Sequence, residues 1–486
     1  MSGGDEIVVA GQTCWRIEQA NRVRPIVDAA DYFRTAKAAM LGARHQIMLI
    51  GWDFDSRIEL ERGDPTVPGP NRLGDFLAWL VQRTPGLDVY LLKWNIGMLY
   101  GLQRGMVPIS ITNWLTEQRL HLMADSRHPV GSAQHEKIVV IDDAFAFCGG
   151  IDMTAQRWDT REHPAHDARR RDPGEREHGP WHDVTTAVEG PVARALGELS
   201  RERWVSAGGS PVEPTQGEVG EIWPDFLVPT FTDVRVAIAR SRPEYGDCTE
   251  VREVEACYLR LIRCARSLIY IETQYLASRV IVEAIIERLA DPDCPEIVLV
   301  LPRNAGGWLE QKAMDGARQR LLRLLWHADA HQRFRVYYPV AEDGSPIYVH
   351  AKVFVMDDRV LRIGSSNLNN RSMGFDSECD LVIDRELQGH DVAPEIRQLR
   401  TDLVAEHLGC RVEDIGDGSL IEVIERLRGE TGRTLTPFDR EEIAEEESIF
   451  ADSELLDPEG RAEAGPTWAK KLRRKAKGRL AGGADR

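Results

Sequence analysis

The sequence lacks several features that would place it in a class at once. Its 8 cysteines form no C-x2-C pair, and such a thin scatter over 486 residues favours reduced thiols over a disulfide framework or a zinc site. No apolar run approaches the roughly 20 residues that span a bilayer. The acidic start, Met1 to Glu6, has no signal-peptide pattern. We therefore expect a cytoplasmic protein, or one exported without a cleavable signal.

Positive charge is also scarce, because 61 Lys and Arg oppose 78 Asp and Glu, giving a formal net charge of −17. A dedicated nucleic-acid-binding domain is usually basic, so we expect no nucleic-acid partner. Hydrophobic residues at 42% and charged residues at 29% are typical of a soluble globular protein with a sizeable core.

One order of elements occurs twice along the chain. In the first half, apolar spacing predicts helices at 30–43 and 73–82 and strands at 45–54, 87–94 and 136–141. In the second half, it predicts helices at 251–265 and 280–289 and strands at 267–276, 296–302, 335–338 and 348–356. Alternating strands and helices indicate parallel-rich sheets in an α/β fold. We predict two similar α/β/α sandwich lobes with pseudo-two-fold symmetry.

Composition divides the chain further. We expect a lead-in at 1–24, a first lobe at 25–205, a linker at 206–234, a second lobe at 235–410 and a C-terminal extension at 411–486. The extension is acidic over Asp439–Glu463 and then basic. In the basic part, apolar residues recur every four positions over Trp468–Leu480, which favours a helix on an anionic membrane surface. A solvated tail or a nucleic-acid-binding tail is the alternative.

Two short motifs carry the chemistry. The first runs from His135 through Lys137 to Asp142, and the second from His350 through Lys352 to Asp357. Residues two apart in a strand point to the same side, so each His and Lys can project into one site. Two copies with identical spacing, at corresponding places of a repeat, predict one active site between the lobes.

Polar residues downstream of the motifs repeat as well. Asp152, in a Gly-Gly-Ile-Asp sequence, lies as far after the first histidine as Asn367, in Gly-Ser-Ser-Asn, lies after the second. The small residues suit a tight turn at the floor of a site, with close approach of a phosphate. Glu162 and Glu378 follow at nearly equal offsets, where a carboxylate can orient each imidazole through its second nitrogen.

On these residues the chain resembles the phospholipase D superfamily, in particular its phosphatidylcholine-hydrolysing branch. The resemblance covers about residues 25–410 and rests, besides the motifs, on Trp52–Asp53, Arg157–Asp159, Pro180–Asp183, Glu189–Pro191, Tyr270–Leu276 and Ile363–Met373. It implies the phospholipase D fold. No region resembling the lipid-targeting domains of that branch precedes the first lobe, so regulation by phosphoinositides or calcium is not implied.

A phosphodiester is anionic and needs cations that do not consume the nucleophile. We expect both motif lysines, with Ser365 and Asn367, to hold its non-bridging oxygens. One histidine attacks phosphorus and the other donates a proton to the leaving alcohol. The resemblance favours His135 as nucleophile and His350 as acid. We expect Asp142 and Asp357 to fix local structure, and we expect no metal or cofactor, because His and Lys replace a two-metal clamp.

The resemblance implies a phospholipase D that releases phosphatidate and a free headgroup and also transfers the phosphatidyl group to small alcohols. The alternatives are a cardiolipin-synthase-like phosphatidyltransferase, a nuclease disfavoured by the acidic charge, and a catalytically silent lipid-binding scaffold. Four tryptophans either line a headgroup or acyl pocket or belong to the core: Trp52, Trp94, Trp158 and Trp181. A monomer suffices, since one chain holds both motifs.

Overall fold

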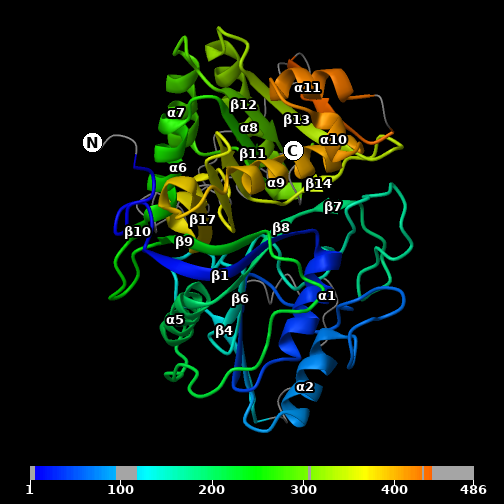
Figure 1. Ribbon diagram of the computed structural model, residues 1–486, viewed down its shortest axis with the longest axis vertical. Helices are drawn as coiled ribbons and strands as arrows, with labels where there is room; N and C mark the ends of the chain where they lie inside the picture. Colours follow the sequence, from blue (N-terminus) through cyan, green and yellow to red (C-terminus); the bar gives the residue numbers. More distant parts are fainter. Residues whose placement is uncertain (1–5, 95–117, 305–307, 430–431, 441–486) are drawn as a thin grey trace, which may run out of the picture.

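The computed structural model describes residues 6–94, 118–304, 308–429 and 432–440. Within these ranges, one mixed sheet of 16 strands runs through both halves (Figure 1). From the outer edge of the second half inward, its strands are β18 (Thr434–Pro437), β13 (Phe334–Val340), β12 (Glu296–Val300), β11 (Leu268–Glu272), β15 (Val353–Met356), β16 (Val360–Gly364), β17 (Glu378–Asp384) and β9 (Phe231–Arg242).

The sheet continues outward through the first half. Its strands there are β1 (Arg16–Val27), β8 (Val184–Glu189), β6 (Phe145–Gly149), β5 (Ile138–Ile141), β2 (Gln46–Gly51), β3 (Asp88–Trp94) and β4 (Leu120–Asp125). Three short strands lie off this path: β10 (Val251–Arg252), which pairs with β9, and β7 (Trp181–His182) and β14 (Tyr348–Val349), which pair with each other.

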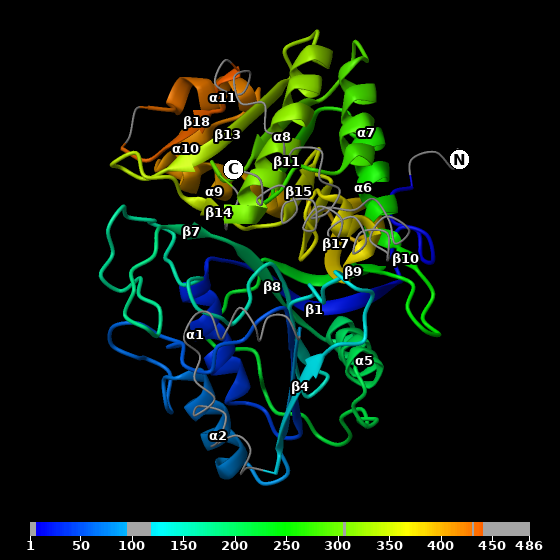
Figure 2. The same cartoon turned by 180° about the vertical axis from the view of Figure 1, so that it is seen from behind.

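The halves meet at the antiparallel pair β1–β9, which we call the seam. Its register joins Arg16 to Ile238 and Val23 to Phe231. Outward from the seam, the strands of the two halves correspond one to one up to β4 and β13. Figures 1 and 2 show the seam crossing the middle of the molecule, with one half on either side. The predicted α/β fold with two similar lobes is confirmed, and the lobes share one continuous sheet.

Helices cover both faces of this sheet. The first half supplies α1 (Ala29–Met40), α2 (Leu73–Arg83) and α5 (Pro191–Ser206). The second half supplies α6 (Glu253–Cys264), α7 (Arg279–Leu289), α8 (Trp308–Ala328), α9 (Ala393–Leu408), α10 (Val412–Ile415) and α11 (Leu420–Leu427), with the short turns η1 (Arg371–Phe375) and η2 (Arg385–Leu387). No helix among the described residues is long and apolar enough to cross a bilayer.

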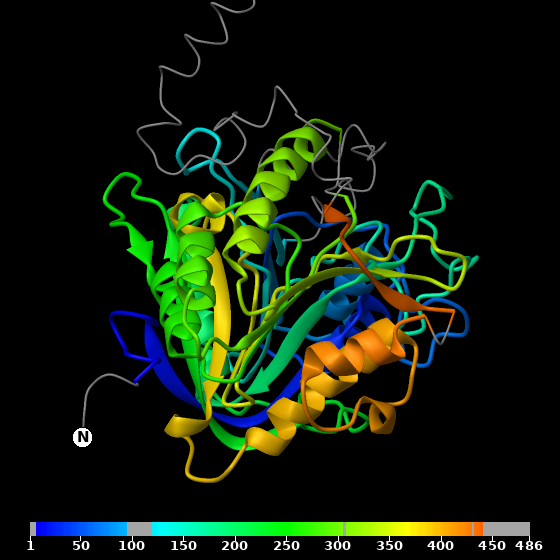
Figure 3. The same cartoon turned by 90° about the horizontal axis from the view of Figure 1, so that it is seen from above.

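Alternation along the strands builds two core layers. In β5, Ile138 and Val140 face a layer shared by both halves and packed by α5, α9 and α11, whereas Val139 and Ile141 face α1 and α2. The equivalent outer layer of the second half contains α6, α7 and α8. Seen from above, the orange helices α9–α11 and the green helices α6 and α7 lie on opposite sides of the yellow strands (Figure 3).

The predicted helices and strands are present, with three corrections. The sheet is mixed rather than parallel-rich, because the hairpins β5–β6 and β15–β16 add antiparallel strands beside the parallel sets β2–β3–β4 and β11–β12–β13. The strand predicted over 348–356 is divided into β14 and β15. β1 begins at Arg16, inside the predicted lead-in.

The division at 25–205, 206–234 and 235–410 stays a prediction. Within the predicted extension, α10, α11 and β18 add to the second half, where β18 pairs with β13. The predicted acidic segment beyond Arg440 and the basic segment Trp468–Leu480 lie outside the described residues.

Candidate active site

The imidazole of His135 is held by a carboxylate from the other half. Its Nδ1 lies 3.0 Å from both oxygens of Glu378, at the start of β17. Two hydroxyls donate to the same carboxylate, Ser365 at 2.5 Å and Ser372 at 2.6 Å. With its Nδ1 hydrogen donated to Glu378, His135 keeps the lone pair of Nε2 for chemistry.

His350, in the second half, is held in the same way by a carboxylate of the first half. Its Nδ1 lies 2.6 Å from Oδ2 of Asp183, immediately before β8 of the first half. The Asp183 side chain is fully buried, and its Oδ1 accepts from the backbone N–H of Val184 at 2.9 Å. A short hydrogen bond between a buried carboxylate and an imidazole favours the protonated imidazole.

Backbone hydrogen bonds between the halves bring each histidine to a carboxylate of the other half. The N–H of His135 donates to the carbonyl of Ser377 at 3.0 Å, and the N–H of Ser377 donates to Ala133 at 3.0 Å. On the other side, β14 pairs with β7, and the N–H of His350 donates to the carbonyl of His182 at 2.8 Å. Each motif therefore enters the site alongside the strand that carries its partner carboxylate.

The motif lysines lie beside the histidines. Lys137 Nζ donates to the carbonyl of His135 at 2.8 Å and pairs with Asp152 at 3.1 Å, and Lys352 Nζ donates to the carbonyl of His350. Both lysines are buried. His135 and Lys137 precede β5, and His350 and Lys352 lie between β14 and β15. The sequence prediction put each His and Lys within one strand, where side chains two apart point to the same side. The residues lie outside the strands, so strand alternation does not explain their common direction.

Burial disfavours the charged form of each titratable group in the free site. Burial, Lys137 and Lys352 hold the pKa of His135 well below its usual range. Burial, Lys352 and Arg157 do the same to the pKa of His350. Burial lowers the pKa of Lys352 to about 7 and raises the pKa of Glu378 to about 8. The site therefore gathers cationic groups whose charge an anion would stabilise.

The turns after β6 and β16 place the downstream polar residues. Asp152 accepts from the N–H of Trp52 at 3.0 Å as well as from Lys137. Asn367 is buried, and its Oδ1 has no hydrogen-bond partner among the described residues. The small residues of these turns were expected to let a phosphate approach closely. At Gly150 the space is filled by a protein group instead, because a Cβ there would lie 2.2 Å from Asp183 Oδ1.

Glu162 is not the partner of either imidazole. It is exposed, and the histidines are held by Asp183 and Glu378 instead. Spacing selected the wrong residue because the connection from β6 to β8 contains an insertion that the connection from β16 to β17 lacks. β8 and β17 are equivalent strands of the two halves. Asp183 directly precedes β8 and Glu378 begins β17, so comparing these two strands would have identified Asp183 as the second carboxylate partner.

Asp142 and Asp357 lie at the far ends of β5 and β15 from the histidines. Asp142 accepts three backbone N–H groups, at 2.7 Å from Arg44, 2.9 Å from His45 and 2.7 Å from Gln46. Asp357 accepts the equivalent groups ahead of β11, from Arg266, Ser267 and Leu268, each at 2.8 Å. Both have positive φ, 50° and 53°, at the hairpin turns. They organise the sheet and do not contact the reacting groups.

Two further side chains, Trp181 and Arg157, lie near His350. The ring of Trp181 lies 5.3 Å from that of His350, and the Arg157 guanidinium lies 4.2 Å from the centre of the Trp181 ring. Trp158 is buried in the core, while Trp52 and Trp94 stack on each other at 5.8 Å. Trp181 therefore lies against a motif histidine.

Family models match both halves. Residues 39–220 match a model described as phospholipase D, and residues 258–400 match one described as cardiolipin synthase, PLD-like domain. Phospholipase D1 of Schizosaccharomyces pombe is 25% identical over 84% of this chain. Phospholipase D alpha 1 of Arabidopsis thaliana is 23% identical over 80% of it. The chain spans 37% of the first protein and 65% of the second.

A solved structure has the same fold. The phosphatidylserine synthase of Haemophilus influenzae Rd KW20 superposes with a TM-score of 0.55 at 12% sequence identity. The match covers 81% of this chain and 88% of that one. A likeness at this identity concerns the fold alone.

Proposed function

This chain belongs to the phospholipase D superfamily, and we propose that it is a phosphodiesterase that hydrolyses glycerophospholipids to phosphatidate and a free headgroup. The proposal depends on one observation: each motif histidine contacts a buried carboxylate of the other half, His135 that of Glu378 and His350 that of Asp183. Two imidazoles that each present one ring nitrogen beside two lysines provide a nucleophile, an acid and a cationic cradle for one phosphodiester.

In the first step, Nε2 of His135 attacks phosphorus and the bond to the headgroup oxygen breaks. His350 gives its Nε2 proton to the leaving alcohol, and a phosphohistidine remains on His135. In the second step, His350 takes a proton from water, which attacks phosphorus, and the phosphorus–nitrogen bond breaks. A primary alcohol in place of water gives the transfer product.

Three features support His135 as the nucleophile. Its side chain is 16% exposed and that of His350 is 6% exposed, so His135 is the more accessible. The carboxylate of Glu378 is shared with two hydroxyls, which weakens its pull on the His135 proton. The Asp183 contact to His350 is shorter and favours an imidazolium. The charge of a bound phosphodiester would raise the pKa of His350 and complete it as the acid.

Lys137, Lys352 and Asn367 would hold the non-bridging oxygens. The hydroxyl of Ser365 donates to Glu378 and would so position His135 rather than bind the phosphate itself. Asp152 pairs with Lys137 and positions the ammonium group. Glu378 and Asp183 are positioning residues by the same reasoning, because each acts through an imidazole.

A membrane surface is the second partner that we propose. The segment from Thr467 to Arg479 carries seven Lys and Arg, and apolar residues recur on one side of Trp468–Leu480. A chain that ends at Pro466 should sediment less with anionic vesicles than the full chain. Equal sedimentation would remove this segment as the membrane contact.

The test of the activity uses mixed phospholipid vesicles with a trace of primary alcohol, followed by mass spectrometry. We expect phosphatidate and phosphatidylalcohol from the full chain and from His166→Ala, whose side chain is 92% exposed, and neither product from His135→Ala. The absence of lipid products from the unaltered chain would contradict the proposal.

A phosphatidyltransferase is the second candidate, because the model that matches the second half is described as a cardiolipin synthase domain. The same two histidines would then pass the phosphatidyl group to a lipid alcohol. Cardiolipin formed from phosphatidylglycerol in the same assay, at the expense of phosphatidate, would favour this activity.

A further inference from the structure

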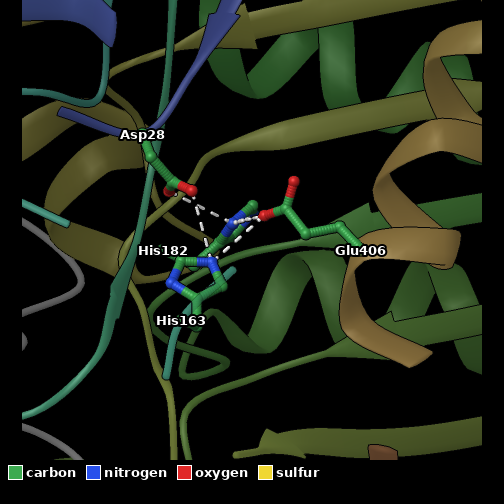
Figure 4. Close-up of side chains that lie close together, drawn as sticks. All are labelled: Asp28, His163, His182 and Glu406. Carbon is green, nitrogen blue, oxygen red and sulfur yellow. Dashed lines mark hydrogen bonds and ion pairs between the residues drawn. The ribbon is translucent and has the colours of Figure 1, made fainter. Parts of the chain in front are cut away.

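A second group of buried imidazoles and carboxylates includes His182, which directly precedes Asp183 in the chain, and we call it the Asp28 cluster. Its members are Asp28, His163, His182 and Glu406. Asp28 follows β1, His163 lies in the connection between β6 and β7, His182 ends β7, and Glu406 belongs to α9. Figure 4 shows these four side chains converging from both halves of the chain. None of them takes part in the proposed mechanism.

The distances within the Asp28 cluster fit one small cation. His163 Nε2 lies 3.3 Å from Asp28 Oδ2 and 3.1 Å from Glu406 Oε1. His182 Nδ1 lies 3.4 Å from Asp28 Oδ1 and 2.9 Å from Glu406 Oε1. Zinc bonds of about 2.0–2.1 Å to nitrogen and oxygen in a tetrahedron separate the ligand atoms by about 3.3 Å. The four donor atoms lie within 4.8 Å of one another.

Each imidazole is also oriented as a metal ligand would be. Nδ1 of His163 lies 2.9 Å from Asp159, and Nε2 of His182 lies 2.8 Å from Glu272. These contacts leave Nε2 of His163 and Nδ1 of His182 pointing at the same two carboxylates. A metal-bound histidine almost always donates its other ring N–H to a carboxylate, carbonyl or water, and here both histidines have a buried carboxylate in that position.

An uncompensated polar atom points into the cluster. Asp28 is 1% exposed, and its Oδ2 accepts no hydrogen bond from any residue that the structure describes. A buried carboxylate oxygen of this kind is costly unless a cation or a donor satisfies it. The ring nitrogen Nε2 of His163 lies 3.3 Å from it.

The charges of the residues around the Asp28 cluster also favour a bound cation. Four buried carboxylates surround the two histidines: Asp28, Asp159, Glu272 and Glu406. Two guanidinium groups pair with them, Arg161 with Glu406 at 2.5 Å and Arg170 with Asp159 at 3.2 Å. Arg161 also pairs with Asp402 at 2.8 Å, and Glu272 also contacts the imidazole of His407 at 3.0 Å. The carboxylates therefore outnumber the guanidinium groups, and a divalent cation between the imidazoles would offset this excess of negative charge.

We propose that the Asp28 cluster binds one divalent transition-metal ion, with zinc as the best fit, in a closed site that ties the two halves of the chain together. Two imidazole nitrogens and two carboxylates match the donors that zinc prefers, and four protein ligands are typical of a structural site. Asp28, His163 and His182 come from the first half and Glu406 from the second, so the ion would cross-link them. This proposal does not rest on the proposed function.

The experiment is zinc binding by the full chain, after chelation and dialysis, with metal content and titration calorimetry as readouts. We expect one zinc per chain and a higher thermal unfolding midpoint on loading. His163→Ala and Glu406→Gln should each lose the tight binding and the shift in midpoint. Asp159→Asn keeps all four ligands and should weaken zinc binding by about 10- to 100-fold. It therefore tests the site even where the other variants fold poorly.

Two controls decide where the zinc lies. His135→Ala removes a histidine of the candidate active site and should keep the tight zinc, as should the exposed variant His166→Ala. X-ray absorption of the loaded chain should report two imidazole nitrogens and oxygen donors. No stoichiometric zinc in the full chain, zinc retained by His163→Ala, or zinc lost in His135→Ala would overturn the proposal.

Discussion

Glu378 in the second half of the chain holds His135 in the first, with Nδ1 of the imidazole 3.0 Å from both carboxylate oxygens. The reciprocal contact joins Asp183 to His350 at 2.6 Å. Each of the two motif histidines is thus held by a carboxylate of the other half. The folded arrangement of both halves is therefore a condition for a competent imidazole, and not only for bringing two finished half-sites together.

Removing the charge of Glu378 should slow the first chemical step. Attack by His135 places positive charge on the imidazole, and this charge favours the ionised carboxylate of Glu378, which stabilises it in a way that a neutral amide does not. We expect Glu378→Gln to lower kcat by about 10²- to 10⁴-fold. A soluble phosphodiester assay measures this, with near-ultraviolet circular dichroism as the check on folding. Glu162→Gln, at the exposed position that spacing had selected, should leave kcat unchanged, and equal losses in the two variants would contradict the pairing.

Asp142 should matter for stability and not for chemistry. Its carboxylate accepts three backbone N–H groups ahead of β2, and Asn tolerates its φ of 50° nearly as well. We expect Asp142→Asn to lower the free energy of unfolding by about 1–3 kcal/mol. Urea unfolding gives this value. A variant that unfolds like the parent, but has lost its activity, would show that Asp142 acts in the site instead.

Anion binding should take up protons. The pKa of Lys352 is lowered to about 7 in the free site, and a bound anion favours the ammonium form and raises that pKa. Affinity for sulfate, whose charge is constant near neutral pH, should therefore fall as the pH rises above about 7. Calorimetry at pH 7.5 in two buffers of different ionisation enthalpy counts the protons.

The matched variant for this experiment is Lys352→Arg, because a guanidinium keeps its proton throughout the range. We expect it to bind sulfate with a smaller proton uptake than the parent chain. Proton uptake equal to that of the parent would assign the linkage to another group.

A glycine outside the chemistry should also control the site. A Cβ on Gly150 would lie 2.2 Å from Asp183 Oδ1 and would displace the carboxylate that holds His350. We expect Gly150→Ala to lower kcat more than it changes KM. Gly179→Ala is the matched control, since its Cβ would meet nothing within 4 Å. Steady-state kinetics on both variants decide this, and a fully active Gly150→Ala would show that Asp183 can shift without consequence.

The sequence predicted what is local and repeated. The two H-x-K-x4-D motifs and the helices and strands around them depend on short spacings, which survive in each half. The central strands escaped notice because β1 carries Arg22, Arg24 and Pro25, a pattern that does not read as the middle of a sheet. Its polar side chains find partners only after folding, as Arg22 does in Glu189 at 2.6 Å.

The carboxylate partners were harder to predict because they depend on contacts between the halves. Counting residues from His350 reaches Glu378, yet that carboxylate binds the histidine of the other half. Counting from His135 reaches Glu162 and misses Asp183, because the insertion between β6 and β8 changes the count. The members of the Asp28 cluster are scattered from the end of β1 to α9, so no spacing marks them.

The seam has the form of a subunit interface closed within one chain. Two equivalent strands pair antiparallel at the centre of a two-fold array, which is the contact that identical subunits make with each other. The covalent connection over 207–230, which packs Ile222 and Trp223 into the core of the first half, then raises the effective concentration of one half beside the other. A chain opened at the exposed residue Val228 should therefore reassemble from its two fragments and recover its catalytic centre.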